Sequence, residues 1–274
     1  MALTSSSRFW RDPQLPWLEA RVVTDGRDFC HAAHAHETFS IGAIMSGRST
    51  YRNGRWQDVV GAGSTVIMNP GDVHACNPIG DAPWAYLMLY IDVAWLGARQ
   101  AELGLGANDD FRPFSAKQNQ APELHRQILG LYQILANEAQ DPLAREQAMV
   151  TFAGQLHTAL SSVGAEVSAC DPRLRRAEQY IRAHCLQPIS LDDICTAAGL
   201  SASHLIRTFK RRYGLTPHEF VVNGRIQYAR RELRQGRPIA EVAQAAGFAD
   251  QAHLQRTFKR YLAATPGHYQ ASSR

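Results

Sequence analysis

Two short helical patterns, each broken by a glycine, repeat in the last third of the chain. Apolar residues recur every three or four positions over Leu191–Ala198 and again over Ile239–Ala246, and Gly199 and Gly247 follow directly. A glycine in that place is typical of a helix C-terminus. A second apolar stripe follows in each copy, formed by Leu205, Phe209 and Tyr213 in the first and by Leu254, Phe258 and Tyr261 in the second. The pattern predicts two helix–turn–helix units.

The sequence of these units repeats as well as their pattern. The pentapeptide Arg-Thr-Phe-Lys-Arg occurs at Arg207–Arg211 and at Arg256–Arg260, and a Thr-Pro pair follows each copy. Such self-similarity indicates one structural unit used twice. Ser190 is a suitable N-cap for the first unit, with Asp193 at the third helical position. Between the units, Pro217–Gln235 predicts one long helix that fixes the two units relative to each other. In DNA-binding helix–turn–helix units the second helix, here called the reading helix, enters the major groove. The long helix would then present two reading helices to successive grooves, roughly 34 Å apart.

The first 120 residues carry a different pattern, made of short β-type runs. The expected strands are Glu19–Val23, Phe39–Met45, Ser49–Arg52, Thr65–Met68 and Trp84–Ile91. Glycine, proline and asparagine turn residues stand between them. Many short strands separated in this way predict a sandwich or a small barrel over residues 1–120.

A further helical pattern covers residues 121–162, divided at Asp141-Pro142. Its apolar positions are Leu124, Ile128, Leu131 and Leu135, then Met149, Phe152, Leu156 and Leu160. This pair of helices is expected either to cover the sheets or to form a dimer interface. Residues 163–172 are polar and small and predict a linker to a C-terminal domain at 173–274. The fold class expected is therefore α+β, with a β-barrel and helical pair followed by an all-α domain.

Charge divides the chain in the same way as the patterns do. Residues 171–274 hold 17 Lys and Arg against 8 Asp and Glu, a net charge of about +9, whereas residues 1–170 hold 12 against 17. A basic domain beside an acidic one predicts a polyanionic partner for the basic domain alone. Together with the repeated helix–turn–helix pattern, this charge favours double-stranded DNA as the partner.

The C-terminal third resembles the DNA-binding domain of the AraC/XylS family of bacterial transcription regulators. The most specific stretch is Ile239–Phe248, followed by Gln251, Arg256 and Thr265-Pro266. Ala263 departs from the family pattern, which has glycine there. The resemblance implies two reading helices with base-contacting residues Ser203, Ile206, Arg207, Gln251, Ala252, Gln255 and Arg256. Lys210, Arg211, Arg212, Lys259 and Arg260 lie further along these helices and are expected to bind phosphates.

The N-terminal pattern resembles the two short motifs of the cupin barrel. The matching residues are His34, His36, Gly47, Gly63, Asn69-Pro70-Gly71 and His74. Cupin enzymes bind a metal through three histidines and a glutamate, but Phe39 and Ser40 stand where the glutamate is expected. Three interpretations remain open for the histidines: lining of an effector pocket, a structural role, or, with Cys76, a site for zinc or another divalent metal. The expected pocket residues are His34, His36, His74, Tyr51, Trp84 and Tyr86.

These observations predict a sequence-specific transcription regulator, an activator controlled by a small molecule in the N-terminal barrel. No required cofactor and no catalysis are expected; the alternative is a metal-binding cupin, sensor or enzyme, fused to a DNA-binding domain. Expected partners are promoter DNA, RNA polymerase, the effector and a second copy of the chain.

No apolar run approaches the roughly 20 residues of a membrane span, and five cysteines without a C-x-x-C pair suit the cytoplasm. Because the reading helices lie in another domain, replacing His36 is expected to leave effector-free DNA affinity unchanged.

Overall fold

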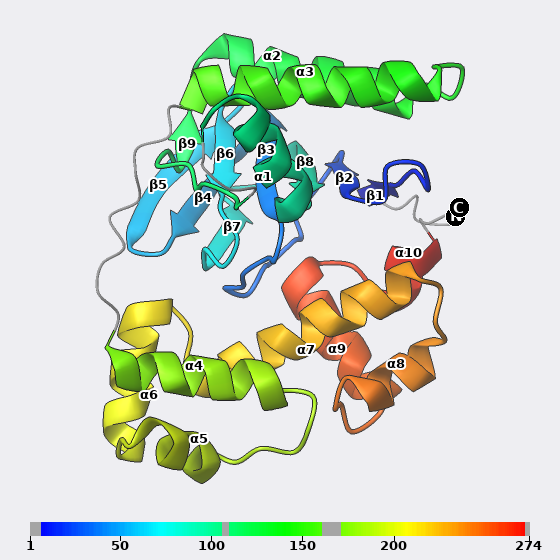
Figure 1. Cartoon of the computed structure of the whole chain (residues 1–274). Coiled ribbons are helices and arrows are strands. Elements are labelled where there is room, and N and C mark those ends of the chain that lie inside the picture. Colours follow the sequence, from blue (N-terminus) through cyan, green and yellow to red (C-terminus); the bar gives the residue numbers. More distant parts are fainter. Residues whose placement is uncertain (1–6, 106–109, 161–170, 272–274) are drawn as a thin grey trace.

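The computed structural model of the protein describes residues 7–105, 110–160 and 171–271. Its elements form a sheet domain with three helices, followed by a domain of helices alone (Figure 1). None of the described helices is both long and apolar enough to cross a membrane. The expected linker 163–172 falls mostly outside the described residues, which resume at Asp171.

The described strands form two antiparallel sheets rather than one continuous sheet. The larger sheet has the order β1 (Ser7–Trp10), β2 (Leu18–Val23), β8 (Ala85–Ile91), β3 (Phe39–Ser46), β6 (Thr65–Met68) and β9 (Gln118–Asn119). The smaller sheet has the order β5 (Trp56–Gly61), β4 (Arg48–Asn53) and β7 (His74–Pro78). The chain passes from the larger sheet to the smaller at Gly47, which has a φ of 74°. A Cβ atom there would lie 2.5 Å from the carbonyl oxygen of Pro83, so only glycine fits.

Alternation along the strands gives the larger sheet two apolar faces. Val23, Ile44, Val66 and Tyr86 face the smaller sheet and form one core with Tyr51. The other face, with Ile41, Leu87 and Leu89 among its residues, packs against helices and forms a second core. The domain therefore has three layers: helices, larger sheet and smaller sheet.

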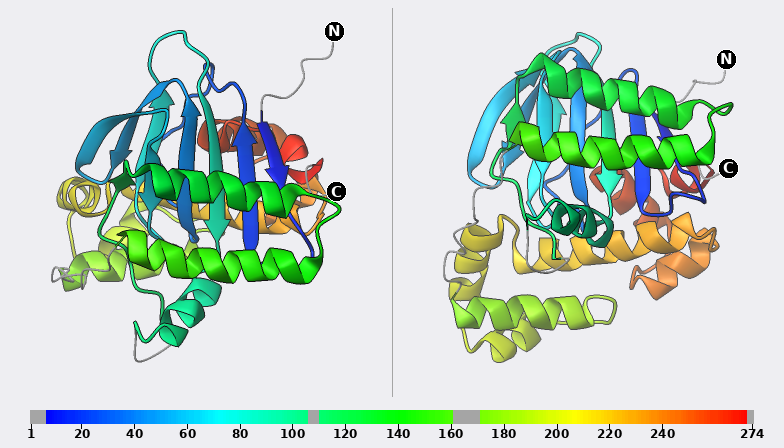
Figure 2. Two further views of the ribbon diagram at one scale, coloured as in Figure 1. Left: turned by 90° about the horizontal axis from the view of Figure 1, so that it is seen from above. Right: turned by 45° about the horizontal axis from the view of Figure 1, so that its top comes forward.

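Helices α1 (Val93–Glu102), α2 (Pro122–Ala136) and α3 (Pro142–Leu160) make the outer layer. Figure 2 shows α2 and α3 lying side by side across the larger sheet, with the break at Asp141-Pro142 that the sequence predicts. All eight apolar residues expected to face inward from this pair are buried. The interpretation that the pair covers the sheet is thus correct, and the outer face of the pair remains exposed.

The C-terminal domain contains α4 (Pro172–His184), α5 (Leu191–Ala198), α6 (Ala202–Tyr213), α7 (Pro217–Arg234), α8 (Ile239–Ala245), α9 (Gln251–Leu262) and α10 (Pro266–Ala271). The local signals in the sequence set these bounds. Ser190 and Asp193 form the expected capping box of α5, and Gly199 ends the helix in the left-handed conformation. Thr216 and Glu219 form a second capping box at the start of α7. Each helix–turn–helix unit has its own core.

The two reading helices, α6 and α9, end on different residues in the same backbone conformation. Gly214 ends α6 with a φ of 77°, and Ala263 ends α9 with φ 48° and ψ 33°. Ala263 is the only residue other than glycine with positive φ in the described part of the chain. The departure from the family pattern at this position therefore places a Cβ atom in a backbone region that disfavours it.

Candidate functional site

The residues expected to read DNA lie on the exposed faces of α6 and α9. Leu205, Phe209, Leu254 and Phe258 are buried on the opposite faces, as the apolar stripes predict. The exposed set consists of Ser203, Ile206, Arg207, Gln251, Ala252, Gln255 and Arg256, together with Lys210, Arg211, Arg212, Lys259 and Arg260. Each reading helix therefore carries exposed polar and basic side chains on the face opposite its apolar stripe.

The basic end of α6 borders a cleft between the two domains. The cleft has a volume of about 1570 Å³, and Lys210, Arg211 and Arg212 are part of its lining. The sheet domain contributes Arg52 and Arg55 to the same cleft. Access of DNA to the C-terminal end of α6 therefore depends on how the two domains are placed.

Three histidines meet at the edge of the sheet domain. The backbones of His34 and His74 exchange two hydrogen bonds, of 3.0 and 2.9 Å. Their ring centroids are 4.5 Å apart, and the His36 ring lies 4.9 Å from His34 and 4.8 Å from His74. All three side chains are buried, and a nitrogen from each ring lies within 4.8 Å of the other two. The spacing in the sequence thus brings three buried imidazoles together.

Hydrogen bonds define which nitrogen of each ring carries the proton. Nδ1 of His34 faces the carbonyl oxygen of Ala32 at 2.7 Å, and Nδ1 of His74 faces that of Asp72 at 2.9 Å. Because a carbonyl oxygen only accepts, both Nδ1 atoms carry the proton. His36 is the opposite case, because Nη1 of Arg230 lies 3.2 Å from its Nδ1 and a guanidinium only donates. The proton of His36 is therefore on Nε2.

These three histidines could hold a metal ion together only if the contact between His36 and Arg230 changed. Tetrahedral zinc at about 2.0–2.1 Å needs its nitrogen ligands roughly 3.3 Å apart, with a lone pair on each. Coordination through Nε2 of His36 would move its proton to Nδ1, where it would oppose the Arg230 donor. Coordination through Nδ1 would displace Arg230 directly. The glutamate that cupin metal sites use is absent, and Glu37 points away and pairs with Arg231 at 2.6 Å.

The histidines line a small cavity that residues of both domains enclose. Its volume is about 50 Å³. From the sheet domain come the histidines, Arg21, His31, Cys76 and an apolar wall that includes Trp84, Tyr86, Met88 and Tyr90. From the C-terminal domain come Arg230, Tyr261 and Leu262. The cavity therefore belongs to the interface between the domains.

Tyr51 is the expected pocket residue that the structure places elsewhere. It is fully buried between the two sheets, and its hydroxyl donates to the carbonyl oxygen of Ile67 at 2.7 Å. Burial raises its pKa, so this hydroxyl stays protonated. Tyr51 on β4 is directed into the core between the sheets, whereas Trp84 and Tyr86 do border the cavity.

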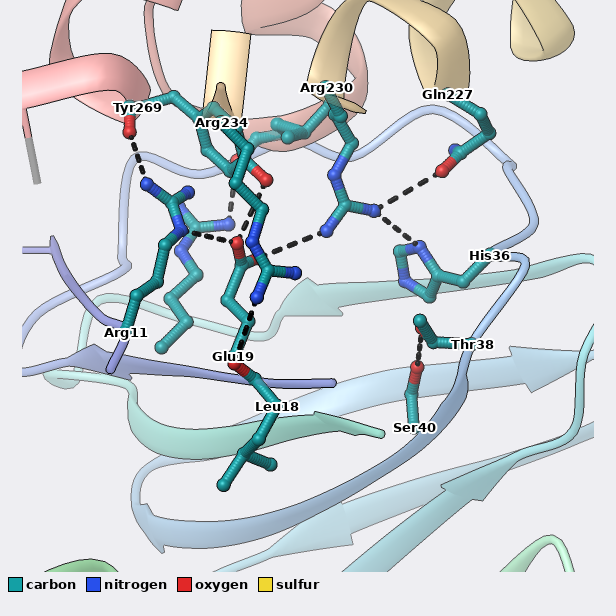
Figure 3. A network of polar contacts seen from close by, with 12 residues as sticks. Arg11, Leu18, Glu19, His36, Thr38, Ser40, Gln227, Arg230, Arg234 and Tyr269 are labelled. Atoms are coloured by element: carbon teal, nitrogen blue, oxygen red, sulfur yellow. Dashed lines mark hydrogen bonds and ion pairs between the residues drawn. The ribbon is translucent and has the colours of Figure 1, made fainter. Parts of the chain in front are cut away.

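A network of buried charges joins the domains beside the cavity (Figure 3). Glu19 on β2 accepts from Arg11 at 2.7 Å, from Arg230 on α7 at 3.1 Å and from the hydroxyl of Tyr269 at 2.8 Å. Burial alone would raise the pKa of Glu19, but the guanidiniums of Arg230 and Arg11 hold it below its ordinary value. Glu19 is thus ionised and binds the two domains together.

The loop that carries the histidines is itself a domain contact. The backbone nitrogen of Ala35 donates to the Asn223 side chain at 3.2 Å, and the Gln227 side chain donates to the carbonyl oxygen of Ala35 at 2.9 Å. His36 is held by Arg230 from the next turn of the same helix. His36 is therefore not independent of the DNA-binding domain, because its ring contacts Arg230 on the helix that joins the two reading helices. The effect of replacing His36 on DNA affinity stays a prediction.

The cavity residues that sequence reasoning missed come from both sides of this interface. They are Phe9, Arg21, His31, Tyr90, Arg230, Tyr261 and Leu262. Arg21 had one detectable signal: it is a charged residue within the apolar run Leu18–Val23. Nothing local distinguishes Arg230 from its neighbours on a helix rich in arginine.

The imidazoles of the site are neutral. Burial lowers the pKa of His34 and His36 well below the ordinary value, and neighbouring His74 lowers both further. Burial, together with the nearby charge of Arg21, lowers the pKa of His31 to about 3. At neutral pH the positive charge around the cavity therefore comes from arginine.

Comparison with known proteins agrees with this two-part architecture. A family model described as an AraC-like ligand binding domain matches residues 19–153, and one described as a helix-turn-helix domain matches residues 194–272. The transcriptional regulator YbfI of Bacillus subtilis is 26% identical over 226 residues, covering 81% of this chain and 80% of the relative. The arabinose operon regulatory protein of Salmonella typhimurium is 28% identical over 248 residues, covering 85% and 83%.

Solved structures show the same fold along nearly the whole chain. An apo variant of ToxT from Vibrio cholerae has a TM-score of 0.56 at 14% identity, covering 94% of this chain and 98% of ToxT. A ligand-binding sheet domain followed by paired helix–turn–helix units defines a class of DNA-binding transcription regulators that respond to small molecules. The chain belongs to the AraC/XylS family of these regulators.

Proposed function

We propose that the protein is a transcription activator whose DNA binding is controlled by a small molecule in the cavity between its two domains. The observation that carries this proposal is the position of Arg230. This residue borders the cavity and lies on α7, the helix that joins the two reading helices. A molecule that changes the contacts of Arg230 acts on the element that sets the relation between the two helix–turn–helix units.

The proposed control is a shift between two placements of the C-terminal domain. In the described placement, Glu19 and His36 hold Arg230, and the basic end of α6 faces the sheet domain across the cleft. An effector that competes for Arg230 would weaken this placement and free Lys210, Arg211 and Arg212 for DNA phosphates. An effector can shift such an equilibrium only by its difference in affinity for the two placements.

The small-molecule class finds support in a structural neighbour. Wild-type ToxT, with a TM-score of 0.56 and 96% of this chain covered, has been solved bound to an unsaturated fatty acid. The known relatives are transcription regulators, which supports a role in regulation rather than catalysis. A cytoplasmic activator of this kind would meet RNA polymerase at the promoter.

A dimer is proposed through the outer face of α2 and α3. Ile134, Leu143 and Val150 are exposed there, with Leu143 at 70% exposure. Leu143 and Val150 are seven residues apart, which puts them on one face of α3 two turns from each other. A dimer would place two pairs of reading helices on one operator.

The experiment for the proposed function separates base reading from phosphate binding. After selection of an operator from random DNA, Arg256→Ala is expected to cost about 1–3 kcal/mol at one part of the site and to relax specificity there. Lys210→Ala is expected to weaken all sequences alike and to reduce the salt dependence. Gel-shift titrations at several salt concentrations measure both. If Arg256→Ala binds the selected operator as tightly as wild type does, the assignment of α9 as the second reading helix is wrong.

A further inference from the structure

Positive charge is in excess around the cavity. The side chains of Arg11, Glu19 and Arg230 are exposed by only 6%, 3% and 11%. Arg21 is exposed by 3%. Within the described residues, Glu19 is the carboxylate that Arg11 and Arg230 contact, and the histidines nearby are neutral. Three buried guanidiniums thus lie around one carboxylate, which pairs with Arg11 and Arg230 only, although buried charge is costly unless it is paired.

Arg21 is the guanidinium that lacks a carboxylate. Its Nε donates to the hydroxyl of Ser7 at 2.9 Å, and its Nη1 donates to the carbonyl oxygen of Leu262 at 2.7 Å. It has no ion pair among the described residues, and its charge rests against the rings of Phe9 and Phe29. These contacts fix the orientation of the group but do not neutralise it.

The hydrogen-bond donors left over belong to side chains that line the cavity. Nη2 of Arg21, Nε of Arg230 and Nε1 of Trp84 are buried and have no hydrogen-bond partner in the part of the chain that the structure describes. Buried donors are normally satisfied, and an unsatisfied one costs about 1–3 kcal/mol. An acceptor that carries a negative charge would satisfy these donors and would also neutralise the charge of Arg21.

We propose that the cavity binds a small monocarboxylate, with Arg21 as its principal anchor and Arg230 as a second donor. A carboxylate offers the two oxygens that a guanidinium binds most strongly. A volume of about 50 Å³ has room for about three to five non-hydrogen atoms, at about 10–15 Å³ for each water-sized position. Acetate and propionate have this size, and Tyr86 and Met88 provide an apolar wall for a short alkyl group.

This inference rests on the proposed function and specifies its effector. A carboxylate near Arg230 would compete with Glu19 and His36 for the same guanidinium. Binding of the acid would therefore change the contacts of α7 with the sheet domain. Arg21 binds the ligand, and the change in the contacts of Arg230 alters how α7 docks on the sheet domain.

Isothermal titration of the full chain without DNA tests the inference, with acetate, propionate, propionamide and inorganic phosphate as probes. Propionate is expected to bind at one site, and propionamide, which has the same size without the charge, is expected not to bind. Arg21→Met is expected to weaken propionate about tenfold or more. Arg234→Met is the matched control, because Arg234 is on the same helix and contacts Pro16 and Leu18 but does not line the cavity.

Arg21→Lys is used if Arg21→Met fails to fold. This variant keeps the positive charge but lacks the paired donors of a guanidinium. It is expected to bind propionate more weakly than wild type does. Equal binding of propionate and propionamide by wild type, or equal binding of phosphate, would overturn the inference. So would wild-type affinity in the Arg21 variants or a loss of affinity in Arg234→Met as large as theirs. Gel shifts run in parallel distinguish failure of this inference from failure of the proposed function. If the protein binds the operator but no carboxylate, only this inference is rejected. Absence of specific DNA binding rejects the proposed function.

Discussion

Glu19 and Arg230 are charged residues in largely buried positions, and they form an ion pair across the contact between the domains. The two side chains are 3.1 Å apart and meet where β2 faces α7. A buried pair of this kind contributes little net stability, whereas loss of one partner leaves an uncompensated charge and costs about 3–5 kcal/mol. The pair therefore fixes how the domains dock more than how strongly either domain folds.

The histidines make the stability of the protein depend on pH. The pKa of His31 is about 3 when folded, compared with 6.5 as the ordinary value. Between these values the unfolded state binds one more proton, so the free energy of unfolding falls as the pH falls, by about 1.4 kcal/mol per pH unit for this residue. Stability is complete above about pH 6.5 and declines below it. Urea unfolding at pH 7, 6 and 5 measures the slope, which His31→Asn is expected to reduce. An unchanged slope in that variant would contradict the assignment.

Ala263 offers a route to higher stability at a single residue. Its left-handed conformation costs a residue with a Cβ atom about 1–2 kcal/mol, and glycine avoids this cost but adds freedom to the unfolded chain. Ala263→Gly is expected to raise the free energy of unfolding by about 1 kcal/mol. Gly214→Ala, at the matching end of α6, is expected to lower it, since its Cβ would also lie 3.2 Å from Val73. Thermal unfolding of both variants gives the comparison, and destabilisation by Ala263→Gly would contradict it.

The helices that the sequence predicts best are those with the strongest local signals. Helices α5, α7 and α9 have both an apolar stripe and an end signal, and the structure places them where the sequence predicts. Strands β5 and β7 were missed because their residues are mainly polar or exposed, so that no apolar alternation marks them. Both flank β4 in the smaller sheet, where pairing with a neighbour rather than burial defines the strand.

The exposed face of α2 and α3 leads to a prediction about oligomeric state. If this face forms the dimer interface, Leu143→Lys should weaken self-association at least tenfold, because a charge would replace an apolar contact. Leu103→Lys is the control, since Leu103 is also exposed, at 50%, but lies at the end of α1. Sedimentation velocity over a range of protein concentrations measures the association. Equal association of wild type and Leu143→Lys would place any dimer contact elsewhere.

The sequence predicts the helices and strands of each domain but not the contact between the two domains. The convergence of His34, His36 and His74 follows from spacing and turns within about 40 residues. The other wall of the cavity comes from residues 230, 261 and 262, about 200 residues further along the chain. Such pairings leave no periodic signal, because they depend on how two complete domains dock.

The domain contact predicts a difference between the whole chain and its DNA-binding part. The cores of the helix–turn–helix units lie almost entirely within residues 171–271, with Phe9 as the buried exception. The fragment 171–274 is therefore expected to fold and to bind the operator as a monomer, without the restraint of the sheet domain. His36→Ala in the full chain removes one contact to Arg230 and is expected to move DNA affinity toward that of the fragment. Fluorescence anisotropy compares the three proteins, and a fragment without specific binding would contradict the prediction.

The long separation between Glu19 and its partners also has a consequence for biosynthesis. Arg11 lies eight residues from Glu19, but the Tyr269 hydroxyl that completes the network comes 250 residues later. At about 5–20 residues per second, a ribosome needs on the order of 10–50 seconds to cover that distance. During this time the newly made sheet domain has an unsealed apolar wall and a carboxylate that lacks two of its partners. The nascent chain is thus most exposed to aggregation and proteolysis in the interval before α7 and α10 have been synthesised.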